Sequence, residues 1–166
     1  ASEYGLQSLP DAWTLSKVGI GAFEDEALQF RQRSKMEWLK PGLDGWGMMR
    51  IYARRYAADP AAEDPRHTPL ERWIYLTQFT QALGLREALE RHRTSDGRYA
   101  GSLYWQLSDA WPTVSWSTVD YYGCWKLANH AVQQTNKPRC VQRAHGRSTE
   151  TLFAFNDAPE ALESTA

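Results

Sequence analysis

Residues 68–83, TPLERWIYLTQFTQAL, carry the strongest helix signal in this chain of 166 residues. Thr68 and Glu71 form a capping-box pattern, in which the hydroxyl oxygen accepts from an amide and the carboxylate reaches back to the helix start. Pro69 is expected at the first helical position, where its missing N–H is harmless. Large apolar residues then recur at helical spacing: Trp73, Leu76, Phe79 and Leu83. The stretch predicts a helix that packs one face against a core.

A glycine and a strand pattern follow this helix. Gly84 is expected to break it, so that residues 85–93 form a second short helical run. Residues 99–109, YAGSLYWQLSD, are predicted to form a strand. Because side chains alternate along a strand, one side would present Leu103, Trp105 and Leu107, and Gln106 would point to the other.

Two more elements extend the pattern in both directions. Residues 1–10 are typical of the end of a strand that runs into a loop, and a helix is expected over about 124–135. Pro138 ends this unit. The order strand, helix, strand, helix is that of a parallel sheet with right-handed crossovers, which predicts an α/β fold.

Residues 11–68 form a long connection inside this unit. A helix is expected around Phe23–Trp38 and another over Met48–Ala58, with Pro and Gly breaking the pattern between them. A connection of this length usually serves a function or has structure of its own.

Beyond Pro138 the spacing becomes alternating. The stretches CVQRA at 140–144 and TLFAFND at 151–157 predict a β-hairpin, or two strands of an antiparallel domain, around His145–Arg147. Residues 138–166 are too few to bury a sandwich core. We therefore expect them to be the opening strands of a second, truncated domain.

The composition argues against several classes of protein. The formal net charge is −1 and the isoelectric point is about 6.5, which argues against a nucleic-acid binder or a polybasic membrane-surface protein. No apolar run is long enough to span a bilayer, and the N-terminus lacks a signal-peptide pattern. Cys124 and Cys140 have neither metal-site spacing nor the number for a disulfide framework. Eight Trp and eight Tyr fit either an aromatic core or a site where sugars stack on rings.

Two separated motifs carry a family resemblance. Residues 2–8, SEYGLQS, are similar to the nucleophile strand of glycoside hydrolase family 2, in its β-mannosidase branch. Residues 101–112, GSLYWQLSDAWP, resemble the last barrel strand of that branch, and the match continues through SWS at 115–117 and DYYG at 120–123. Residues 155–159, FNDAP, resemble the start of the immunoglobulin-like domain that follows the barrel.

This resemblance implies a fold. Residues 1–137 would be the C-terminal part of a (β/α)₈ TIM barrel, holding strands seven and eight, and residues 138–166 would begin an immunoglobulin-like β-sandwich domain. The chemistry of such barrels lies at the C-terminal ends of the strands. The N-terminal part of the same enzyme would be missing from this chain and would be its partner.

The resemblance also implies a reaction, the hydrolysis of terminal β-D-mannose from oligosaccharides by a retaining exo-β-mannosidase. Retaining glycosidases use two carboxyl groups about 5–5.5 Å apart. Glu3 matches the nucleophile. The acid/base of the family is a Glu that follows an Asn, and this sequence has no Asn-Glu pair. The partner carboxylate is expected outside the chain, which alone would be inactive or weakly active.

Further substrate-binding candidates lie on the last strand and in the loops. Trp105 is expected under the sugar ring, with core packing as its alternative. Asp109 either faces the site or caps the adjoining turn. Trp111 and Trp116 suit a sugar contact, a rim role or packing. His67 either contacts substrate from its loop or makes a local hydrogen bond.

Other assignments stay open. A β-galactosidase, β-glucuronidase or exo-glucosaminidase of the same family would share the nucleophile chemistry, although the run after Glu3 favours the mannosidase branch. A non-catalytic carbohydrate-binding module would use the aromatic loops, but the helix signal over 69–93 argues against a β-sandwich. Asp120 is expected to hold its loop together. The expected ligand is a mannose-containing oligosaccharide, and no cofactor or metal is expected. Neither a nucleic acid nor a membrane is an expected partner. The compartment stays undetermined.

Overall fold

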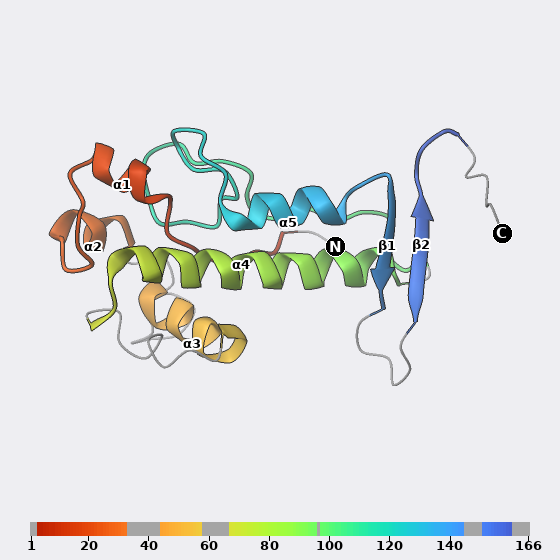
Figure 1. The fold of residues 1–166 in the computed structure, drawn as a ribbon, viewed down its shortest axis with the longest axis horizontal. Coiled ribbons are helices and arrows are strands. Elements are labelled where there is room, and N and C mark those ends of the chain that lie inside the picture. Colours follow the sequence, from red (N-terminus) through yellow and green to blue (C-terminus); the bar gives the residue numbers. More distant parts are fainter. Residues whose placement is uncertain (1–2, 33–43, 58–66, 96, 145–150, 161–166) are drawn as a thin grey trace.

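The computed structural model describes residues 3–32, 44–57, 67–95, 97–144 and 151–160. In these ranges the chain forms helices followed by one hairpin, a small α/β fold with a two-stranded sheet (Figure 1). The elements in chain order are α1 (Ala12–Lys17), α2 (Glu26–Gln32), α3 (Gly45–Ala57), α4 (Leu70–Arg93), α5 (Leu127–Thr135), β1 (Arg139–Arg143) and β2 (Leu152–Asn156).

The long helix α4 forms the axis of the molecule (Figure 1). It continues for 24 residues, so the predicted break at Gly84 is wrong. Packing explains the glycine, because a Cβ at this position would lie 2.3 Å from Leu6 Cδ1. Gly84 therefore makes room for a side chain while keeping helical geometry. The helix begins at Leu70, with Pro69 as its N-cap residue instead of its first helical residue.

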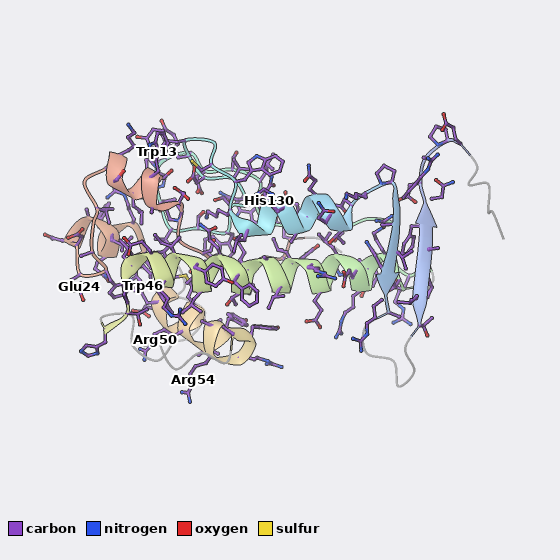
Figure 2. All side chains as sticks on the ribbon, in the orientation of Figure 1. Trp13, Glu24, Trp46, Arg50, Arg54 and His130 are labelled. Atoms are coloured by element: carbon purple, nitrogen blue, oxygen red, sulfur yellow. The ribbon has the colours of Figure 1, made fainter. Side chains whose placement is uncertain are left out.

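Two helices and two apolar clusters surround α4. Helices α3 and α5 pack against α4 and lie on different sides of it in Figure 1. One cluster joins α1, α2, α3 and the first half of α4; it includes Leu15, Leu28, Met49 and Trp73. The other joins the second half of α4 to α5 and contains Leu85, Leu89, Ala128 and Val132. Trp46, labelled in Figure 2, belongs to the first cluster, whereas Arg54 extends from the exposed side of α3.

The N-terminal segment from Tyr4 to Leu9 runs antiparallel along α4. The Tyr4 ring meets the His92 ring in the last turn of α4, with centroids 5.2 Å apart. The Leu9 N–H donates to Thr77 Oγ1, at 3.2 Å, further towards the helix start. The helix thereby determines the path of the extended segment.

Gln81 of α4 is fully buried and joins this segment to the loop that precedes α5. Its Nε2 lies 2.9 Å from the carbonyl oxygens of Leu6 and Trp116 and 3.1 Å from that of Ser117. Its Oε1 accepts from the Ser8 hydroxyl at 2.7 Å. One side-chain amide therefore satisfies polar groups from two segments that are distant in sequence.

Residues 99–109 are less regular than the predicted strand. Tyr104 forms an isolated parallel bridge with Tyr4, and Ser108 forms another with Val119. A strand ladder needs consecutive paired residues on neighbouring segments. The segment makes single bridges, so the predicted strand is wrong as a continuous element, although the expected parallel direction is found at Tyr4–Tyr104.

Burial along this segment alternates as a strand would. Leu103, Trp105 and Leu107 are exposed by 66%, 50% and 61%, while the residues between them are half-buried. This alternation agrees with the prediction that the three side chains share one side, which would be the exposed one.

Residues 11–57 contain more helix than their irregular pattern suggested. Helix α1 was not predicted; the Asp11 carboxylate caps it by accepting from the Trp13 N–H at 2.8 Å. Helix α2 begins after Phe23, and the remainder of the predicted helix through Trp38 lies outside the described residues. Helix α3 begins at Gly45, slightly before its expected start.

The predicted hairpin is confirmed. β1 and β2 pair antiparallel, with Arg139 opposite Asn156 and Arg143 opposite Leu152. The predicted turn around His145–Arg147 lies outside the described residues. In the described part of the chain, no helix is long and apolar enough to cross a membrane.

Candidate active site

The two motifs of the sequence meet where residues 3–5 pass residues 104–106. The Trp105 N–H donates to the Tyr4 carbonyl oxygen at 2.8 Å. Glu3 directly precedes this contact and is exposed. Its φ of 30° lies in the left-handed region, which non-glycine residues rarely adopt. The fold therefore brings together the nucleophile candidate and the Trp105 candidate.

Trp105 lies on the open face of its segment. The preceding residue, Tyr104, forms the bridge with Tyr4 and packs against the Leu85–Leu89 cluster. Trp105 belongs to neither apolar cluster of the described residues, and half of its surface is exposed. An exposed indole is suited to contact a ligand that has both an apolar face and hydroxyl groups.

Gly5 allows the close approach of the two segments. A Cβ at Gly5 would lie 2.1 Å from the Trp105 carbonyl oxygen and 3.4 Å from Trp116 Cδ1. Trp116 is half-buried beside this glycine, and with it lines a cavity of about 50 Å³ that reaches Met49 and Tyr52 of α3. Trp116 is therefore near the Glu3 segment.

Asp109 is engaged in contacts within its loop. Its carboxylate accepts from the Ser117 hydroxyl at 2.6 Å and from the Gln106 amide at 3.3 Å. The same amide donates to the Ser108 carbonyl oxygen at 2.9 Å. These contacts favour the turn-capping alternative for Asp109 and a structural role for Gln106.

Trp111 and His67 lie towards the other end of α4. The Trp111 ring contacts Phe30 of α2, with centroids 6.4 Å apart, and α2 lies at the N-terminal end of α4 (Figure 1). His67 precedes α4, while Tyr4 lies against the last turn of this helix. The 24 residues of α4 correspond to roughly 36 Å. The structure does not bring His67 to Glu3.

Asp120 holds its loop together, as expected. The buried carboxylate accepts from the Thr14 hydroxyl at 2.6 Å and from the backbone N–H groups of Tyr122 and Cys124 at 3.1 and 2.9 Å. Burial raises the pKa of the Cys124 thiol, and the Asp120 charge adds to this effect. These contacts join the start of α1 to the loop before α5.

A group of three residues beside Glu3 was missed by the sequence reasoning. Ser102 Oγ lies 2.6 Å from the Tyr4 hydroxyl and 2.7 Å from His92 Nδ1. Burial lowers the pKa of His92. Burial also raises the pKa of Tyr4, against the opposing effect of the Ser102 hydrogen bond. No local spacing signals this group, because Tyr4 and Ser102 are 98 residues apart.

Among the side chains that the structure describes, no group of three or more His, Cys, Asp and Glu residues could hold a metal ion.

Comparisons with known proteins give one consistent relationship. No family model matches the chain. β-Mannosidase B of Aspergillus flavus is 33% identical over 143 residues, which cover 84% of this chain and 16% of the relative. The crystal structure of a β-D-mannosidase from Dictyoglomus thermophilum matches with a TM-score of 0.74 and 27% identity, over 96% of this chain and 18% of that one. An exo-β-D-glucosaminidase structure, with a TM-score of 0.52 and 18% identity over 88% of this chain and 17% of that one, shares the fold alone.

The extent of these matches is uneven. They cover most of this chain, but the chain spans only about one sixth of the length of the curated relatives that it matches. The resemblance inferred from the two motifs is confirmed, since sequence and fold point to the same enzymes. Together they identify the chain as a segment related to the β-mannosidases of glycoside hydrolase family 2.

Proposed function

We propose that this segment belongs to a retaining β-mannosidase that removes terminal β-D-mannose from oligosaccharides, with Glu3 as its nucleophile. One observation carries the proposal: the Trp105 N–H donates to the Tyr4 carbonyl oxygen at 2.8 Å. This hydrogen bond joins two motifs that are far apart in sequence. The segments that carry the Glu3 carboxylate and the exposed Trp105 indole therefore lie side by side.

The exposure of Glu3 and Trp105 beside one bridge pair supports a common site for them. Tyr4 and Tyr104 are parallel bridge partners, and both pack against the Leu85–Leu89 cluster. Glu3 precedes Tyr4 and Trp105 follows Tyr104, and both are exposed. A sugar ring at this place could contact both.

The chemistry then follows the two-step scheme of retaining enzymes. The Glu3 carboxylate attacks the anomeric carbon and forms a glycosyl ester, while a second carboxylic acid gives its proton to the leaving oxygen. The second group, now a base, takes a proton from water, and this water hydrolyses the ester with overall retention. Trp105 supports the ring as it flattens towards the oxocarbenium ion. The second carboxyl group comes from the remainder of the enzyme, its partner outside this chain.

We also propose the barrel assignment for residues 1–137, as strands seven and eight with α4 and α5 on the outside. The parallel bridge between Tyr4 and Tyr104, with α4 between them in the sequence, supports this arrangement. The open apolar side with Leu103 and Leu107 suits the inner face of a barrel strand. The antiparallel β1–β2 pair supports a separate β-sandwich that begins in residues 138–166.

Replacing the proposed nucleophile in the enzyme that contains this segment tests the proposal. With dinitrophenyl β-mannoside, whose leaving group needs little protonation, Glu3→Gln is expected to lower kcat by about 10³-fold or more. Glu24→Gln, at an exposed acid labelled in Figure 2, is the matched control and should leave the rate unchanged. A 2-fluoro mannoside should label the peptide that contains Glu3. Labelling of another carboxylate would rule out this nucleophile.

The exo-glucosaminidase neighbour makes a second specificity worth testing. Its likeness extends to the fold alone, so specificity must come from the contacts to the sugar. A panel of aryl glycosides with one leaving group separates the candidates. We expect the highest kcat/KM for the mannoside; faster cleavage of the galactoside, glucuronide or glucosaminide would reassign the substrate.

A further inference from the structure

We infer that Tyr4, Ser102 and His92 form a positioning network that holds the backbone of Glu3 in the conformation from which its carboxylate attacks the sugar. The inference rests on the proposed function, because it presumes that Glu3 is the nucleophile. None of the three side chains is required to touch the sugar. Each acts on Glu3 through Tyr4.

Ser102 is the centre of the network. Its Oγ lies 2.6 Å from the Tyr4 hydroxyl and 2.7 Å from His92 Nδ1. A hydroxyl carries one proton and two lone pairs, so it can join both hydrogen bonds with either tautomer of the imidazole. The His92 ring also meets the Tyr4 ring edge-on, with centroids 5.2 Å apart. The Tyr4 side chain is therefore held at its hydroxyl and at its ring.

The main chain of Tyr4 is held as well. Its carbonyl oxygen accepts from the Trp105 N–H at 2.8 Å. Glu3, the preceding residue, has a φ of 30°. A strained backbone of this kind persists only where the surrounding structure holds it in place. Tyr4, fixed by side-chain and main-chain contacts, is the adjacent residue that holds it.

The network has a rigid base. His92 lies in the last turn of α4, and this half of α4 packs against α5 through Leu85 and Leu89. The order of contacts is therefore from α4 to His92, to Ser102, to Tyr4 and to Glu3. Removal of one link should loosen Glu3 without opening the apolar cluster.

The test measures the attack step directly in the enzyme that contains this segment. Tyr4→Phe and Ser102→Ala each remove the hydrogen bond between the two hydroxyl groups. The rate of the dinitrophenol burst from dinitrophenyl β-mannoside reports attack by Glu3. We expect each variant to slow the burst about tenfold, with KM changed less than twofold. The double variant should be no slower than Ser102→Ala alone, because Ser102→Ala already removes the Tyr4–Ser102 hydrogen bond that Tyr4→Phe removes.

Tyr99→Phe is the matched control. The Tyr99 ring also contacts His92, with centroids 4.6 Å apart, but among the described residues its hydroxyl has no part in the network. This variant should keep the wild-type burst. Thermal melts of all variants should agree within about 2 °C, since an exposed or half-buried hydroxyl contributes little to stability.

Three outcomes would overturn the inference. They are a wild-type burst in Tyr4→Phe and Ser102→Ala, a double variant in which the two losses add, or losses that scale with a fall in thermal stability. The proposed function fails separately: in that case Glu3→Gln retains activity. If Glu3→Gln is inactive while the network variants are normal, only the network is refuted.

Discussion

At the scale of single residues, Gly5 determines how closely the Glu3 segment approaches Trp105. The Trp105 carbonyl oxygen occupies the space that a Cβ at Gly5 would need, at 2.1 Å. This neighbour is backbone, which cannot rotate away as the end of a side chain can. A methyl group at this position must push the two segments apart.

We therefore predict that Gly5→Ala lowers kcat/KM for an aryl β-mannoside by tenfold or more in the enzyme that contains this segment. The binding site proposed between Glu3 and Trp105 would be disrupted. Gly101→Ala is the matched control, because a Cβ there meets no atom within 4 Å. Equal activity of the two variants would show that the close approach has no role in the site.

The candidate residues differ in how far sequence could predict them. Glu3 and Trp105 lie in the two motifs on which the family resemblance rests, and the fold brings these motifs together. Asp109 is a candidate because it ends the predicted strand, and His67 because it lies in the loop before the helix cap. The structure gives them other surroundings than a sugar site. The Asp109 carboxylate accepts from the Ser117 hydroxyl, and His67 lies before the start of α4. Residue type shows what a side chain can do, but its neighbours determine whether it is available.

At the scale of elements, α4 shows a conflict between local propensity and packing. Glycine in a helix interior costs about 1 kcal/mol relative to alanine, which is why a break was expected at Gly84. The helix continues because its sides are held by α3, α5 and the N-terminal segment. Tertiary packing, more than propensity, determines the length of most helices.

We predict that Gly84→Ala stabilises the isolated helix but does not stabilise the folded protein. A peptide of residues 70–93 should gain helix content by circular dichroism, because alanine is the better helix former. In the enzyme that contains this segment, the melting temperature should not rise. The new Cβ lies 2.3 Å from Leu6 Cδ1, and displacing that side chain offsets the gain. A rise of several degrees would show that Leu6 moves away without cost.

At the scale of the whole molecule, several large apolar side chains are exposed. Leu103, Trp105 and Leu107 are the exposed residues of one side of their segment, and the hairpin has exposed side chains of its own at Val141 and Leu152. Exposed apolar surface promotes association, and so do segments with unpaired backbone groups. In the proposed barrel, further strands would cover the first three residues.

We predict that the 166-residue chain, purified alone, self-associates at micromolar concentration. Sedimentation velocity should detect species larger than a monomer. The double variant Leu103→Gln/Leu107→Gln should shift the distribution towards monomer, because it replaces apolar groups with polar ones on this side. A stable monomer with a sharp, reversible melt would contradict this prediction.

The sequence by itself determined the family, the approximate positions of α3, α4 and α5, the hairpin and the identity of the nucleophile candidate. These features depend on local patterns: helical and alternating spacing, turn residues and two short motifs. Only the tertiary structure decided that Tyr4 pairs with Tyr104, that Gly84 lies inside one continuous helix, and that Ser102 bridges Tyr4 to His92. Each of these features needs atoms from segments that are distant in sequence, and local periodicity contains no information about which distant atoms will meet.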